Sequence, residues 1–281
     1  RTQIPGGGGV RRPHPFTTVR PPHPPQNPRP WLAHLLSLAL LVLLLWLVGQ
    51  RLHWALLQSL DFSVVWHFRW ALLEGLGVSL QVTVIALGAG FVLTLPLVVA
   101  LQSPRRWLNW GCRATIELIR DIPFVVLLLW GHFALPLATG IPTTPLQSGS
   151  TMLALKVATY SALVVHAGIL ALPRGQLEAA DALGLPLRVK WGIVLLPQAL
   201  RIVVPTLASL AIMWFQFSAV LSIISVPELM TRAERIVMAV PRPIEVLSSV
   251  ALLYLLLGLT FTYAVHRLER RWTPPSATAR S

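Results

Sequence analysis

The stretch GQLEAADALGLPLRVKWGIVLLP, residues 175 to 197, is a polar interruption between two long apolar runs. Its first part, Gly175 to Leu183, consists mainly of helix formers, and Gly184 stands where a left-handed C-terminal cap is expected. Pro186 suits the first turn of a second helix, which we expect to run to Pro197. The stretch therefore predicts a short helix-turn-helix between two apolar segments.

Small and acidic residues give the first of these helices a surface suited to another protein. Ala179 and Ala180 would let a second backbone approach closely, and Glu178 and Asp181 offer hydrogen-bond acceptors one turn apart. An ordinary amphipathic loop lying on lipid headgroups would share these features. From the residues alone, both alternatives stay open.

The composition places the chain in a membrane. Of its 281 residues, 54% are hydrophobic and 12% are charged, outside the range of a soluble globular domain. The net charge of +13 does not indicate a nucleic-acid partner, because the arginines lie between apolar runs rather than on one basic face. The single cysteine, Cys112, can form neither an intramolecular disulfide nor a multi-cysteine metal site. We therefore expect no metal and no nucleic acid.

Apolar runs long enough to cross a bilayer, which takes about 20 residues, predict an all-α membrane protein with six transmembrane helices. They lie at Trp31 to Gly49, Gly75 to Leu101, Ala114 to Leu137, Thr151 to Leu172, Ile202 to Val226 and Val246 to His266. The third begins with charged residues, of which we interpret Glu117 and Arg120 as a structural pair. Lys156 lies five residues into the fourth, where it could either reach the outer interface or line a solute path.

Basic residues orient these helices. Sixteen of the 23 Lys and Arg fall in the N-terminal tail and in residues 101–113, 173–201 and 267–281. Because cytoplasmic loops carry the excess of basic residues, we expect both termini and the quoted stretch to be cytoplasmic.

The predicted organisation has a peripheral helix and a five-helix core. The segments are a disordered basic Pro/Gly-rich tail (1–30), a leucine-rich peripheral transmembrane helix (31–49), an external loop (50–74), the core (75–268) and a cytoplasmic tail (269–281). Within the core, Gly75, Gly77, Gly88 and Gly90 predict a helix that others approach closely.

The spacing of the quoted stretch matches a known motif. Glu178-Ala179-Ala180, followed by Gly184, Val194 and Leu196-Pro197, resembles the EAA loop of permease subunits of ABC importers. The segments 75–80, 116–123 and 226–229 resemble the polar amino acid branch of that family, and the resemblance covers residues 70 to 270.

The resemblance implies a transport subunit of the bacterial cytoplasmic (inner) membrane, with the five-helix core of this family and no catalytic residues. An ATP-binding cassette subunit would dock on Gly175, Glu178, Ala179, Ala180, Asp181 and Gly184. The chain has no Gly-x4-Gly-Lys-Ser/Thr motif, so ATP-Mg belongs to that partner and this chain binds no cofactor. An external substrate-binding protein and a second permease subunit, identical or different, complete the expected assembly, which moves amino acids or similar small polar solutes inward.

The sequence departs from the family pattern inside the membrane. Leu163 and His166 stand where the family usually has a glutamate and an arginine, and Gln216 to Val220 stands where it has Lys-Asp-Thr-Ser-Leu. We therefore predict a path of low charge between the fourth and fifth helices, lined by Tyr160, Leu163, His166, Ser209, Gln216 and Ser218. Two alternatives stay open: the divergent half of a heterodimeric permease, and a membrane docking or sensor protein that moves no solute.

Overall fold

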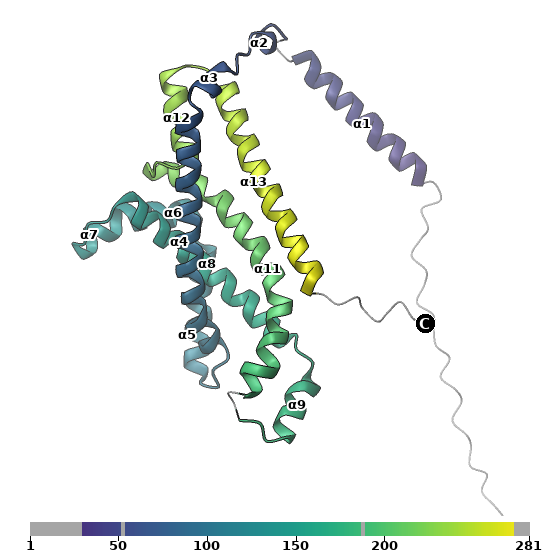
Figure 1. Ribbon diagram of the computed structural model, residues 1–281, viewed down its shortest axis with the longest axis vertical. Helices are drawn as coiled ribbons and strands as arrows, with labels where there is room; N and C mark the ends of the chain where they lie inside the picture. The colour runs from purple at the N-terminus through teal and green to yellow at the C-terminus, as the bar shows by residue number, and fades with distance from the viewer. Residues whose placement is uncertain (1–29, 52–53, 187–188, 273–281) are drawn as a thin grey trace, which may run out of the picture. The chain divides into compact units, whose positions relative to one another are not determined.

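The computed structural model describes residues 30–51, 54–186 and 189–272, where all its regular elements are helices (Figure 1). The chain divides into two compact units, Arg1–Ser59 and Leu60–Ser281. The first contains helices α1 (Pro30–Arg51) and α2 (Trp54–Gln58). The predicted N-terminal tail and most of the predicted C-terminal tail lie outside the described residues.

The second unit contains the long helices. Its elements are α3 (Ser63–His67), α4 (Arg69–Leu101), α5 (Arg106–Asp121), α6 (Phe124–Leu129), the π-helix η1 (Trp130–Ala134), α7 (Leu135–Thr139), α8 (Pro145–Leu170), α9 (Arg174–Ala182), the π-helix η2 (Lys190–Leu195), α11 (Leu196–Phe217), the 3-10 helix η3 (Ser218–Ile224), α12 (Leu229–Ala239) and α13 (Pro243–Trp272). The segment predicted as an external loop, residues 50–74, therefore contains α2, α3 and the start of α4.

Within the described residues, four uninterrupted helical segments are long and apolar enough to cross a membrane. They are Arg69–Leu101, Pro145–Leu170, Lys190–Ile224 and Pro243–Arg267, and each contains most of one predicted span. Helix α1 coincides with the predicted peripheral span, but the described residues do not establish the predicted count of six.

The predicted third span is not one straight helix. Arg106–Asp121 and Phe124–Thr139 meet at an angle of 100°. The break follows from Pro123, because proline has no amide proton and disfavours helical geometry in the preceding residue. Ile122 is accordingly extended, with φ −64° and ψ 125°. The expectation of one helix from Ala114 to Leu137 is wrong because this proline interrupts an otherwise apolar run.

The second helix of the polar stretch also differs from the prediction. It does not end at Pro197 but continues through η2 into α11. A proline ring clashes with the carbonyl of the fourth preceding residue in a regular helix, and here that residue, Ile193, lies in the wider π turn. Pro136 follows η1 in the same way. In both places the wider turn lets the helix pass a proline.

Close packing of α4 depends on two of its four highlighted glycines. A Cβ on Gly90 would lie 2.5 Å from Val157 of α8, and one on Gly75 would lie 2.9 Å from the Leu229 Cα of α12. A Cβ on Gly77 or Gly88 would meet nothing within 4 Å. The prediction of close approach is therefore confirmed at Gly75 and Gly90 alone.

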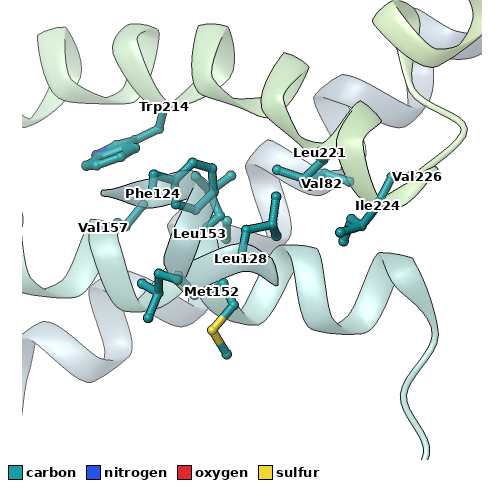
Figure 2. Packing of buried hydrophobic residues seen from close by; sticks show 13 residues of the cluster. Val82, Phe124, Leu128, Met152, Leu153, Val157, Trp214, Leu221, Ile224 and Val226 are labelled. Carbon is teal, nitrogen blue, oxygen red and sulfur yellow. The ribbon is translucent and has the colours of Figure 1, made fainter. Parts of the chain in front are cut away.

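The largest buried cluster joins α4, α6, α8, α11 and η3 (Figure 2). Its labelled members are Val82, Phe124, Leu128, Met152, Leu153, Val157, Trp214, Leu221, Ile224 and Val226. Because α8 contributes Met152, Leu153 and Val157 to this cluster, it is the central helix of the unit.

Candidate docking loop and solute path

Helix α9 ends in the turn that the sequence predicts. Gly184 is left-handed, with φ +62°. The Leu185 amide donates to the Ala180 carbonyl at 3.1 Å and the Gly184 amide donates to the Asp181 carbonyl at 3.0 Å. These two bonds form a Schellman motif, which pairs carbonyls that the helix end leaves open. The predicted left-handed cap is confirmed.

The side chains of α9 divide into an exposed group and an internal group. Glu178, Ala179 and Ala182 are exposed, whereas Ala180 is 3% exposed. The Lys190 Nζ lies 2.6 Å from the Asp181 Oδ1 and joins α9 to η2. Asp181 therefore helps to hold the loop together, and because its side chain is 67% exposed, its contact with a docking partner stays a prediction.

An apolar base connects this loop to the bundle. Leu172, Leu195 and Ala199 are buried together, and Ile169 from α8 and Trp191 from η2 pack against them. The cluster spans the end of α8, the loop and the start of α11. The cluster therefore joins the segments on either side of α9 to the ends of both long helices.

The C-terminal end of α5 is held by a buried lysine. The Lys156 Nζ donates to the carbonyls of Ile119, Arg120 and Ile122 at 2.7, 3.0 and 2.6 Å. Lys156 is 4% exposed. Its ammonium supplies donors that the broken helix cannot provide, since Pro123 has no amide proton. Lys156 therefore neither reaches the interface nor offers a donor to a solute in this structure.

Arg120 contacts an aromatic ring rather than its expected partner. No ion pair joins Glu117 to Arg120 among the described residues. The Arg120 Cζ lies 4.8 Å from the centre of the Tyr160 ring. Tyr160 also meets Trp214 edge to face, with ring centres 5.3 Å apart. The interpretation of Glu117 and Arg120 as a structural pair is wrong, because Arg120 stacks on α8 instead.

The six predicted path residues have different surroundings. Tyr160 packs against the main buried cluster, and Leu163 packs against the separate cluster of α4 and α5. His166 is half-buried, and its Nδ1 has no hydrogen-bond partner. These three residues share α8, but Leu163 offers no polar group where the family pattern has a charge.

The other three residues belong to α11 and η3. Ser209 is exposed, and Gln216 is exposed with its Nε2 3.6 Å from where a Cβ of Gly258 would lie. Ser218 is fully buried and donates to the Phe215 carbonyl at 2.7 Å. The structure therefore does not bring the six residues into one site, and the path stays a prediction.

A cavity of about 270 Å³ lies on another side of α11. Its lining comes from α4, α11 and α13 and comprises Leu80, Thr83, Val84, Leu87, Ala208, Ala211, Ile212, Phe215, Phe261, Ala264 and Val265. Thr83 is the one polar side chain among them, and its hydroxyl donates to the Ser79 carbonyl. The cavity does not suit a polar solute.

A buried carboxylate that the sequence analysis left without a role joins α4, α12 and α13. Glu228 is fully buried and accepts hydrogen bonds from Ser79, Tyr254, Met230 and Thr231, at 2.8 to 3.2 Å. It caps the N-terminus of α12. Burial raises the pKa of the Glu228 carboxyl, and the amides of Met230 and Thr231 oppose that shift. The sequence signal for this cap was an acidic residue directly before an amphipathic segment.

Among the described residues, no three His, Cys, Asp or Glu side chains form a group that could hold a metal ion. The fold and the loop instead define a multi-pass α-helical membrane protein whose packed polar loop is connected to two of its membrane-length helices.

Comparison with known proteins identifies the family. Residues 86–274 match the model of the binding-protein-dependent transport system inner membrane component. The glutamine transport system permease protein GlnP of Escherichia coli (strain K12) is 30% identical over 216 residues, covering 76% of this chain and 98% of the relative. The arginine transport system permease protein ArtQ of Bacillus subtilis (strain 168) is 30% identical over 214 residues, covering 76% and 98%.

Solved structures agree with these relatives. An amino acid ABC transporter superposes with a TM-score of 0.72 at 28% identity, covering 76% of this chain and 99% of the other. The MetNI methionine ABC transporter gives a TM-score of 0.65 at 25% identity, covering 74% and 98%. The chain belongs to the family of binding-protein-dependent transport system inner membrane components. It is an ABC importer permease of the inner membrane and a transport subunit rather than an enzyme, which confirms the family predicted from the EAA spacing.

Proposed function

We propose that this permease moves amino acids or similar small polar solutes inward and that its ATPase subunit docks on α9. The solute class is supported by the names of the relatives, which include glutamine and arginine permeases. ATP and Mg²⁺ belong to the partner, and an external substrate-binding protein delivers the solute. A second permease subunit completes the complex, and both termini of this chain are cytoplasmic.

The observation that carries this proposal is the construction of the loop. Helix α9 presents Glu178 and Ala179 on its exposed side, and its far end is fixed by the left-handed Gly184 and by the ion pair of Asp181 with Lys190. The apolar base of Leu172, Leu195 and Ala199 connects the segments that flank α9 to α8 and α11. Closure of two ATPase subunits would move α9, and this packing would carry the movement into the bundle.

The test uses the turn at Gly184. A Cβ there meets nothing within 4 Å, so a substitution is strained by the positive φ rather than by space. Gly184→Val should lower both ATPase association and ATP-driven uptake in proteoliposomes, whereas Gly184→Asn should retain most of both, because asparagine tolerates the left-handed region. Gly192→Ala is the matched control, since Gly192 is also exposed with open space around it.

Glu178→Lys tests the docking surface itself, because it reverses an exposed charge without touching the turn. We expect weaker association of the ATPase subunit at low salt than at high salt. A well-inserted Glu178→Lys or Gly184→Val chain with normal ATPase association and uptake would show that docking occurs elsewhere. Association without any solute movement by the unaltered complex would favour the docking or sensor alternative.

One observation favours the heterodimeric form of the assembly. Leu163 packs into the apolar cluster of α4, α5 and α8, so this chain has no charge where the family pattern has one. A sibling permease would then supply the missing groups. Gln216→Ala should leave uptake nearly unchanged if the sibling holds the solute and should reduce it clearly if this chain lines the site.

A further inference from the structure

Three helices meet where α5 breaks, and each contributes one side chain to a single stack. Arg120 from α5 lies over one face of Tyr160 from α8, with 4.8 Å between its Cζ and the ring centre. Trp214 from α11 meets the same ring edge to face at 5.3 Å. The stack therefore holds the Arg120 guanidinium beside two aromatic rings, close to the break between α5 and α6.

Two donors in this stack have no acceptor. The Arg120 Nε and the Trp214 Nε1 are both enclosed and have no hydrogen-bond partner among the residues that the structure describes. Trp214 is 2% exposed, so its indole N–H lies away from bulk solvent. Buried donors are nearly always paired, and an unpaired one is costly. A transporter changes conformation, and donors left unpaired in one state are placed to meet an acceptor in another.

The local charge favours an anion as that acceptor. Lys156 adds a second buried positive charge beside Arg120, and its three hydrogen bonds go to backbone carbonyls. No ion pair involves Lys156 or Arg120 in the part of the chain that the structure describes. The carboxylates nearest in sequence, Glu117 and Asp121, are exposed. Asp121 acts electrostatically on Lys156, so Arg120 is the cation that is placed to stabilise an anion between the helices.

We propose that Arg120 and Trp214 bind the carboxylate of the transported solute. The solute is then a neutral or acidic amino acid, because a cationic side chain would be repelled by Arg120 and Lys156. Phe217, which is 38% exposed, lies 5.5 Å from Trp214 and 6.0 Å from Phe124 between ring centres and offers an apolar face for the rest of the solute. This inference rests on the proposed function, since it assigns the solute class of that same importer.

The experiment measures ATP-driven uptake by the whole complex in proteoliposomes, with L-glutamine, L-glutamate and L-arginine as probes. Arg120→Gln should raise the KM for the preferred neutral or acidic probe by at least about tenfold, the value of a charge-assisted hydrogen bond. It should also reduce discrimination against L-arginine. Trp214→Phe keeps the ring and removes the N–H, and it should raise KM by about two- to tenfold.

Arg113→Gln is the matched control, because Arg113 is an exposed arginine of the same helix that bonds Asn109 on its own helix. It should leave KM and selectivity unchanged. ATPase association should remain normal in all three variants, since none touches α9.

An unchanged KM in Arg120→Gln and Trp214→Phe, or a preference of the unaltered complex for L-arginine, would overturn the subsite while leaving the transport function intact. Absence of ATP-driven uptake of all three probes by the unaltered complex, with its ATPase bound, would overturn the proposed solute class and this inference together.

Discussion

Lys156 shows how one side chain can stabilise a break in a transmembrane helix. Its ammonium donates to three carbonyls at the end of α5 and is almost completely buried. A neutral side chain of similar length would leave those carbonyls without donors in a place where lipid and packed side chains offer none. The residue therefore stabilises the fold of this chain whatever solute is transported.

We predict that Lys156→Met lowers the free energy of unfolding by about 3 kcal/mol, because buried acceptors lose a charged donor. Thermal unfolding of the purified chain in detergent measures the effect. Thr151→Ala is the control on the same helix, since Thr151 is exposed and its hydroxyl bonds only the preceding turn. Equal unfolding temperatures for Lys156→Met and Thr151→Ala would argue against the capping role.

At the residue scale, the sequence was sufficient where a residue's conformation depends only on its neighbours along the chain. The left-handed Gly184 follows from the helix formers before it and the proline after it. The role of Lys156 depends on a contact with residues 34 to 37 positions earlier, and spacing within one segment cannot show it. The available signal was a lysine in one span together with a proline in the span before it.

At the scale of helices, α4 offers two glycines for a direct comparison. A Cβ on Gly75 would press on backbone atoms of α12, with 2.9 Å to the Leu229 Cα, and one on Gly77 would meet open space. We predict that Gly75→Ala destabilises the chain by about 1–3 kcal/mol through overpacking. Gly77→Ala should be neutral or slightly stabilising, because alanine favours a helix. Thermal unfolding of the two variants checks the difference, and equal stabilities would contradict the close contact of α4 with α12.

The positions of the long helices were predictable from apolar length, but the interruptions were harder to place. Pro123 ends α5, whereas Pro197 lies inside a continuous helix because η2 widens the turn before it. In both places the proline lacks an amide proton and crowds the preceding turn. Tertiary packing decides whether the helix breaks there or widens into a π turn and continues. The 100° bend of the third predicted span is therefore a property of the bundle as well as of Pro123.

At the scale of the whole molecule, orientation decides whether α9 can meet an ATPase. Reporter fusions after Arg106 and Arg188 should be cytoplasmic, and fusions after Asp61, Gln147 and Arg235 should be external. Two contacts agree with this grouping: Arg232 of α12 lies 3.0 Å from Glu74 of α4, and the Asp61 amide donates to Glu245 of α13. An external reporter at Arg188 would contradict the transport function.

The family was predictable from one motif because the EAA spacing is specific, and the match of residues 86–274 to the family model confirms it. The solute path was not predictable in the same way. Leu163 and Ser218 both occupy positions where polar contacts with a solute were expected. The Leu163 side chain instead packs in an apolar cluster, and the Ser218 hydroxyl donates to the Phe215 carbonyl. A path between the fourth and fifth predicted spans depends on how those helices pack, which spacing within each segment does not show.

The most direct test of the central claim is a cross-link from α9 to the ATPase subunit. In a Cys112→Ala background, Glu178→Cys places the chain's single thiol on the exposed side of α9, while Thr139→Cys places it on an exposed site of α7. We predict that Glu178→Cys forms a cross-link to the co-expressed ATPase subunit, that its yield changes when ATP binds, and that Thr139→Cys forms none. A stable, transport-active complex in which Glu178→Cys gives no cross-link and no ATP-dependent change would contradict docking on this helix.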